Sequence, residues 1–174
     1  MTMKITFDVL GYVEAQERLL GRDEGRMPDH LITINDPDRR PPRGAERVEG
    51  RVLELSFYDL RDPGMGSAYS LQRPVPADVA KIIEFGRDVG REGGHLLVHC
   101  MAGISRSTAA TLIVLATQSE PHEARALERM VTRNRPISNP NDLMLQFADE
   151  QLGWDGALAG LGGDARFSLY GTVG

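Results

Sequence analysis

The chain has 174 residues, 41% of them hydrophobic, which is enough to bury one core, so we expect a single domain. The net charge of −5 argues against nucleic acid as the main partner, because nucleic acid binding depends on clustered Lys and Arg. No apolar run is long enough to span a membrane and no secretory leader is visible, so we expect a cytoplasmic protein without a membrane partner.

Alternation of apolar and polar residues predicts three strands in the first third of the chain. The apolar members are Ile5, Phe7 and Val9, then Ile32 and Ile34, then Leu53, Leu55 and Phe57. The segment from Tyr12 to Leu20 is predicted to form a short helix that ends at Gly21.

The middle of the chain predicts a helix, a buried strand and a second helix. After Pro76, apolar residues recur at the helical spacing of Val79, Ile82, Ile83, Gly86 and Val89. A pair of glycines then leads into the apolar run 95–98, which fits a buried strand. Residues 107–116 are apolar nearly all round, as in a helix at the centre of a domain.

Two further helices are predicted near the end of the chain. Pro121 opens the first, and Asn139 as N-cap with Pro140 at the first helical position opens the second. We expect residues 1–153 to form one domain around a central sheet. Residues 154–174 are predicted to be a Gly- and Ala-rich tail, and the sequence indicates neither order nor disorder for it.

The most informative stretch lies between the buried strand and the central helix and reads His99-Cys100-Met101-Ala102-Gly103-Ile104-Ser105-Arg106-Ser107. The first N–H groups of a helix lack partners and the helix dipole is positive there, so this loop is suited to an anion. Gly103 allows the amides to turn inward, and Arg106 can hold two phosphate oxygens in a planar fork. The same field favours the thiolate of the single cysteine, Cys100.

This loop resembles the signature of the cysteine-dependent protein tyrosine phosphatases, which is His-Cys, five residues, Arg and Ser. The Ala-Gly-Ile-Ser-Arg-Ser form is similar to the dual-specificity branch, here expected to be of bacterial type, and residues 134–141 and 145–147 resemble its downstream segment. The resemblance implies the protein tyrosine phosphatase-like α/β fold, with a central mixed sheet of four to five strands flanked by helices. It also implies hydrolysis of phosphotyrosine, with phosphoserine and phosphothreonine as further substrates, through a phosphocysteine and without a cofactor.

The resemblance implies a role for each residue of the loop. Cys100 attacks phosphorus, and the phosphate is bound by Arg106 together with Met101, Ala102, Gly103, Ile104 and Ser105. The Ser107 hydroxyl bonds the leaving thiolate, the backbone, or both. His99 could order the loop or carry protons, and the field at a helix start disfavours its charged form, which favours the ordering role. Asp59 and Asp62 compete as the general acid. The family pattern favours Asp59, which directly follows a predicted strand, whereas Asp62 also fits a simple Asp-Pro-Gly turn.

Other interpretations stay open at this stage. Four alternatives are consistent with part of the motif. They are an ordinary buried thiol, a phosphate-binding module without catalysis, a phosphatase for non-protein esters and a sulfurtransferase. The neutral loop residues Met101, Ala102 and Ile104 weaken a phosphoinositide substrate, so we expect a phosphorylated protein as the partner. No pair of histidines has zinc-site spacing, so we expect no metal, and the sequence does not indicate the oligomeric state.

Five arginines surround the Pro41-Pro42 pair, at Arg39, Arg40, Arg43, Arg47 and Arg51. Mixed charge with Pro and Gly is ordinary for a solvated loop, which is the simpler interpretation. The alternative is that these arginines flank an acidic or multiply phosphorylated substrate.

Overall fold

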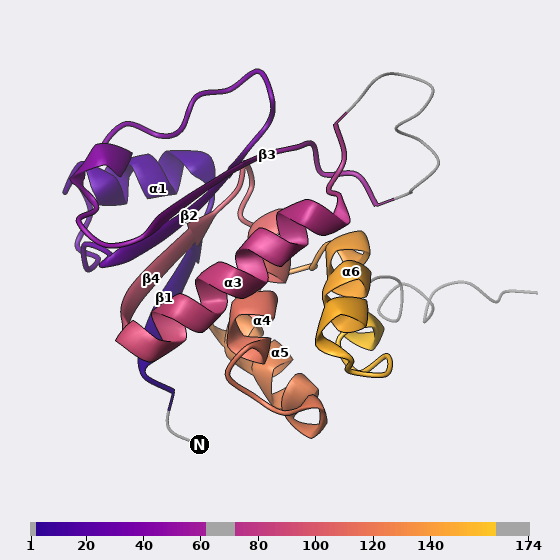
Figure 1. Cartoon of the computed structure of the whole chain (residues 1–174). Coiled ribbons are helices and arrows are strands. Elements are labelled where there is room, and N and C mark those ends of the chain that lie inside the picture. The colour runs from indigo at the N-terminus through magenta and orange to yellow at the C-terminus, as the bar shows by residue number, and fades with distance from the viewer. Residues whose placement is uncertain (1–2, 62–71, 163–174) are drawn as a thin grey trace, which may run out of the picture.

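The computed structural model describes residues 3–61 and 72–162. Its elements in chain order are β1 (Ile5–Leu10), α1 (Tyr12–Leu19), β2 (His30–Asn35), the 3-10 turn η1 (Ala45–Arg47), β3 (Val52–Ser56), α3 (Pro76–Glu92), β4 (Gly94–His99), α4 (Arg106–Ala116), η2 (Pro121–Glu123), α5 (Ala124–Asn134), α6 (Asp142–Leu152) and η3 (Ala159–Leu161). Figure 1 shows α1 on one face of the sheet and α3, α4, α5 and α6 on the other. The predicted α/β fold with a sheet flanked by helices is confirmed.

The four strands pair in the order β1-β4-β2-β3, and each of the three pairings is parallel. The resemblance predicts a mixed sheet, but the described residues contain no antiparallel pairing. The reason is that β1 and β2, and likewise β3 and β4, are joined by a helix that returns the chain in the same direction. Parallel strands bring their carboxyl ends to one edge, where β1, β2 and β4 end at Leu10, Asn35 and His99.

Apolar side chains alternate between the two faces of the sheet, so the domain has one hydrophobic cluster on each face. On the α1 face, Leu31 and Leu97 pack against Ala15 and Leu19. The neighbouring strand residues contribute to the larger core on the opposite face, which includes Ile32, Ile34, Leu96 and Val98. Successive side chains of a strand point to opposite faces, so each buried strand contributes to both layers.

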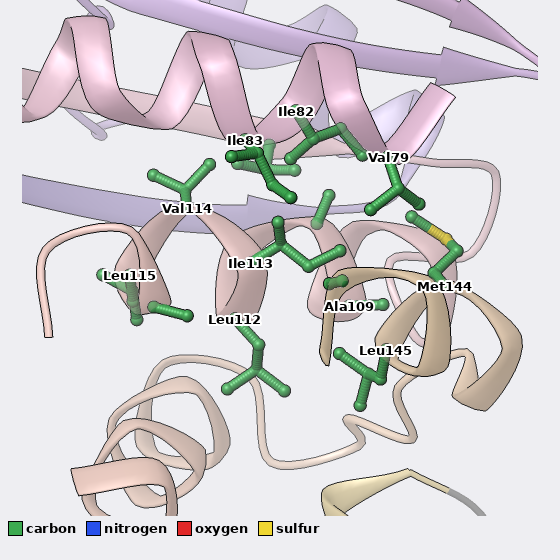
Figure 2. Close-up of a cluster of buried hydrophobic side chains, with 14 of the residues drawn as sticks. Val79, Ile82, Ile83, Ala109, Leu112, Ile113, Val114, Leu115, Met144 and Leu145 are labelled. Carbon is green, nitrogen blue, oxygen red and sulfur yellow. The ribbon is translucent and has the colours of Figure 1, made fainter. Parts of the chain in front are cut away.

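Helix α4 lies at the centre of the larger core, and all eleven of its residues are buried. Figure 2 shows Leu112, Ile113 and Val114 among side chains from α3 and α6. Such complete burial explains the apolar pattern around the whole helix. It also fixes the start of α4, and therefore the loop before it, against the rest of the domain.

The start of the last helix differs from its prediction. Helix α6 begins at Asp142 with Asn141 as N-cap, so the prediction of Asn139 as N-cap and Pro140 as first residue is wrong by two positions. The backbone N–H groups of Asn139 and Asn141 donate to the carbonyls of Ile104 and Ser105, at 2.8 and 3.2 Å. Because these backbone N–H groups bond to the loop carbonyls, residues 139–141 stay outside the helix, which begins only at Asp142.

The segment after α6 continues the domain. Trp154, Leu158 and Leu161 pack into the larger core, and the Asp149 carboxylate accepts backbone hydrogen bonds from Gly156, Leu158 and Ala159. The first part of the predicted tail is therefore continuous with the domain, and its remainder from 163 to 174 lies outside the described residues. Among the helices of residues 3–61 and 72–162, none combines the length and apolar character needed to cross a bilayer.

We predict that Ile113→Ala lowers the free energy of unfolding by about 2 to 5 kcal/mol, because it leaves a cavity among fully buried side chains. Urea unfolding monitored by fluorescence measures the change. Val13→Ala is the control, since Val13 is 71% exposed and its truncation should change stability by less than about 0.5 kcal/mol. Equal effects of the two substitutions would contradict the assignment of α4 to the centre of the core.

Candidate active site

The loop 100–105 lies at the carboxyl edge of the sheet, between the end of β4 and the start of α4. In open α/β sheets this edge is where ligands bind, and here the N-terminus of a buried helix points at the same place. Cys100 follows β4 directly, and Arg106 is the first residue of α4. The structure therefore gives the strand, loop and helix order that the sequence predicts.

The Cys100 sulfur is buried, with 2% of the residue exposed, and it has polar partners from the loop and the helix. The backbone N–H of Gly103 donates to Sγ at 3.3 Å, and the Ser107 hydroxyl lies 3.1 Å from it. Together with the start of α4, these groups present positive charge density to the sulfur.

All carbonyl groups from Met101 to Ser105 are bonded on the outer side of the loop. Tyr12 N–H donates to the carbonyl of Met101, the Arg135 guanidinium to those of Ala102 and Gly103, Asn139 N–H to that of Ile104 and Asn141 N–H to that of Ser105. The last two carbonyls also accept from the Thr108 hydroxyl of α4. In a trans peptide the N–H points away from the preceding carbonyl, so the amides of residues 102–106 face the inside of the loop. The loop is thus a ring of backbone donors, which is an anion-binding nest.

Gly103 is required for this backbone path. Its φ of +69° is rare for residues with a Cβ, and a Cβ there would lie 2.6 Å from the backbone of Leu10 and Gly11. Gly11 is also tight, since a Cβ on it would lie 3.2 Å from the Met101 oxygen. The β1–α1 junction therefore packs directly behind the loop.

Arg106 is buried, with 4% of the residue exposed, and it is held from one end of its guanidinium. Nη1 donates to the Asp36 carboxylate at 2.7 Å and to the Phe57 carbonyl at 2.6 Å. Buried Nε has no hydrogen-bond partner among the residues that the structure describes. An unpaired buried donor is costly, and an oxyanion in the nest would pair it. Asp36 is not among the site residues predicted from the sequence, although its position directly after β2 is at the ligand-binding edge.

His99 is buried behind the loop in a chain of hydrogen bonds. The ring lies 2.5 Å from the Thr33 hydroxyl through Nε2 and 3.2 Å from the Cys100 carbonyl through Nδ1, and Asn35 donates to the same hydroxyl at 3.0 Å. These partners fit a neutral ring with its proton on Nδ1. Burial, reinforced by the charge of Arg106, lowers the pKa of His99 to about 4. A ring that stays neutral orders the loop and does not carry protons near neutral pH.

Asp59, which follows β3, contacts the phosphate loop through the Ser105 side chain. Its Oδ1 accepts from the Ser105 hydroxyl at 2.7 Å and from the Asn141 amide at 2.8 Å. Asn141 also caps α6 by accepting from Met144 N–H at 3.0 Å. Asp62, the competing acid, lies outside the described residues.

Asn141 and Arg135 contribute to the site although the sequence analysis assigned no role to either. Both lie in the segment 134–141 that carries the family resemblance, which was the available signal. No cluster of three or more His, Cys, Asp and Glu suited to a metal occurs within residues 3–61 and 72–162.

We predict that the protonation of His99 lowers the free energy of unfolding by about 2 kcal/mol between pH 7 and pH 5. The folded state keeps the ring neutral down to a pKa of about 4, whereas the unfolded chain takes up a proton near its ordinary value of about 6.5. The contribution of the neutral ring to the free energy of unfolding is therefore complete above the pKa of the unfolded chain. It is lost as the pH falls towards the pKa of the folded state. Urea unfolding of wild type and His99→Gln at both pH values measures it.

In this test the variant should lose less stability on acidification than the wild type. His122→Gln, which removes an exposed histidine, serves as the matched control and should keep the wild-type slope. An unchanged slope in His99→Gln would contradict a buried neutral ring.

Comparisons with known proteins agree with this geometry. No family model matches the chain. A stretch of 81 residues, 47% of this chain, is 35% identical to dual specificity protein phosphatase 15 of Rattus norvegicus and 36% identical to that of Homo sapiens. The stretch is 34% of the rat protein and 27% of the human one, so the match spans about a third or less of these curated relatives.

Solved structures of phosphatases resemble the chain over most of its length. The crystal structure of DUSP15 has a TM-score of 0.60 at 21% identity and covers 89% of both chains. Tk-PTP in the active form has a TM-score of 0.56 at 20% identity, covering 88% of this chain and 93% of that one. PTPMT1 in complex with PI(5)P has a TM-score of 0.54 at 20% identity, covering 86% and 90%.

At such identities the structural likeness establishes the fold, and the bacterial type stays a prediction. In sequence over the matched stretch and in fold over most of its length, the chain is dual-specificity-phosphatase-like, which confirms the resemblance carried by its motifs.

Proposed function

We propose that the chain is a protein phosphatase that hydrolyses phosphomonoesters, above all phosphotyrosine, through a phosphocysteine intermediate. The observation that carries the proposal is the loop after Cys100, whose carbonyls from Met101 to Ser105 all accept hydrogen bonds while the Gly103 N–H donates to the Cys100 sulfur. At the start of the following helix, Arg106 keeps a buried Nε without a partner among the described residues. A tetrahedral oxyanion pairs all of these donors at once. The names of the similar proteins support the same class of reaction.

In the first step, the Cys100 thiolate attacks phosphorus in line with the ester oxygen. A sulfur–phosphorus bond forms while the bond between phosphorus and the ester oxygen breaks, and Asp59 donates a proton to the departing oxygen. Arg106 and the loop amides bind the equatorial oxygens through the transition state. The products of this step are the free hydroxyl compound and a phosphocysteine.

In the second step, water attacks the phosphocysteine and inorganic phosphate leaves. The Asp59 carboxylate accepts a proton from the water, so it returns to its starting form. The electron pair of the sulfur–phosphorus bond returns to Cys100, and the Ser107 hydroxyl, 3.1 Å away, donates a hydrogen bond to the thiolate.

The hydrogen bonds of Asp59 suit a general acid. Both of its described donors, from Ser105 and Asn141, bond the same oxygen, Oδ1. A proton on the carboxyl group then resides on Oδ2, which has no described partner. This arrangement leaves one oxygen for orientation and the other for proton transfer.

A phosphate-binding module without catalysis would have the same nest, so turnover is the decisive measurement. We expect p-nitrophenyl phosphate hydrolysis in the presence of a metal chelator. Cys100→Ser should reduce it to background, and Arg106→Lys should lower kcat/KM by about 10³-fold, because lysine cannot form the planar fork. Arg125→Lys, on the exposed side of α5, is the matched control with wild-type activity. Activity that survives in Cys100→Ser would falsify the thiolate mechanism.

The choice of acid predicts a difference between two variants. Asp59→Asn should lower kcat by about 10² to 10⁴-fold and flatten the fall of activity at basic pH, whereas Asp62→Asn should keep the wild-type profile. Asn141→Asp retains an acceptor for the α6 cap but places a second carboxylate against Asp59, so the basic limb should move to higher pH. Measurement of kcat against pH for the three variants tests the assignment, which fails if only Asp62→Asn flattens the basic limb.

A further inference from the structure

The loop 36–44 carries arginines that the proposed mechanism does not use. Of the five arginines in the predicted cluster, Arg47 donates to a backbone carbonyl at the end of α1 and Arg51 pairs with two carboxylates of α3. The other three are exposed, and their side chains form no hydrogen bond or ion pair within the described ranges; they are Arg39, Arg40 and Arg43, here called the arginine rim. Two arginines of the cluster therefore have partners within the domain, and the three of the rim have none among the described residues.

The loop is fastened to the catalytic site at two points. Asp36, at its start, binds Arg106 at 2.7 Å. Further along, the Tyr12 hydroxyl donates to the carbonyl of Arg40 at 3.1 Å, while the backbone N–H of Tyr12 donates to Met101 in the phosphate loop at 3.0 Å. The chain between the two points therefore lies beside the phosphate loop and Arg106, and it contains the first two arginines of the rim.

Beyond Tyr12 the loop follows α1 away from the nest. The Arg43 N–H donates to the Gln16 side chain at 3.2 Å, and Arg47 reaches the Leu20 carbonyl at 3.3 Å. With a rise of 1.5 Å per residue, Gln16 lies about 6 Å and Leu20 about 12 Å along the helix axis from Tyr12. Arg43 is thus the outer member of the rim, and Arg47 lies at the far end of α1.

The rim is an excess of positive charge on an acidic protein. Residues 38–43 have a net charge of +2, from three arginines and Asp38, whereas the whole chain has −5. The nearby carboxylates of Asp36 and Glu14 are already paired with Arg106 and Arg135. The cations beside the nest are therefore available to an anion that reaches the site from outside.

We propose that the arginine rim selects phosphoproteins that carry a second negative charge, a phosphate or a carboxylate, within about three residues of the phosphorylated side chain. This proposal rests on the proposed phosphatase function. An extended peptide advances about 3.3 Å per residue, so three residues span about 10 Å, which exceeds the roughly 6 Å from Tyr12 to Gln16 that the rim follows along α1. The substrate phosphate lies in the nest while the second charge lies against Arg39 and Arg40.

A peptide fits the rim better than a membrane surface does. Binding to anionic lipid through basic residues takes a cluster of about four to eight Lys or Arg. The rim has three arginines, one of them offset by Asp38, and the net charge of −5 repels the chain from an anionic bilayer. The charge is sufficient for one added anion but not for a lipid surface.

The test compares two phosphotyrosine peptides of equal length, one flanked by Glu and the other by Gln, with the whole chain as enzyme. We expect wild type to have about five-fold higher kcat/KM for the acidic peptide, from two exposed charge pairs. The double variant Arg39→Gln/Arg40→Gln should have equal kcat/KM for both peptides, as should wild type at high salt, because exposed charges are screened. Arg47→Gln, from the far end of the same segment, is the matched control that should keep the preference.

Hydrolysis of p-nitrophenyl phosphate by wild type separates the two proposals. No turnover of this substrate overturns the phosphatase function itself, whereas turnover without a peptide preference overturns only the rim. A preference that survives in the double variant also overturns it. A third arm of the test uses phosphoinositide vesicles as the substrate. If wild type hydrolyses them faster than either peptide and the double variant loses that advantage, the rim recognises lipid. The assignment of the rim to peptides is then wrong.

Discussion

The anion site depends on one constraint, which is that every carbonyl from Met101 to Ser105 must point away from the sulfur. Only then do the amides of the same peptides converge on one point. Backbone carbonyls that are buried without partners are costly, so the inward arrangement of amides requires donors on the outside of the loop. The structure supplies a donor for each carbonyl, from three separate parts of the chain.

These outer donors explain why a short motif needs a whole domain. Tyr12 belongs to the start of α1, Arg135 follows α5, and Asn139 and Asn141 precede α6. Figure 1 shows α1 on one face of the sheet and α5 and α6 on the other, so the three regions come together only when helices have packed on both faces. The nest is therefore preorganised by tertiary structure, which reduces the reorganisation required when phosphate binds.

The sequence was sufficient to predict the elements whose pattern is local. Residues 95–98 and 107–116 were correctly predicted as buried strand and central helix, since burial leaves an apolar pattern. Asp36 and the start of α6 were beyond such an analysis, because both depend on contacts made across 70 and about 35 positions of the chain. Asn139-Pro140 has good local chemistry for a helix start, but its backbone is used to bond the phosphate loop. Tertiary hydrogen bonding outweighed local preference there.

Asn141 connects the two functions of this region. One end of its amide caps α6, and the other end donates to Asp59, so the position of the acid depends on where the helix begins. Ser105 makes the second contact to Asp59 from within the phosphate loop. An exposed carboxylate would otherwise sample several rotamers and lose entropy on reaching a substrate oxygen. Two fixed donors on one oxygen remove that cost in advance, and they orient the acid relative to the same loop that orients the nucleophile.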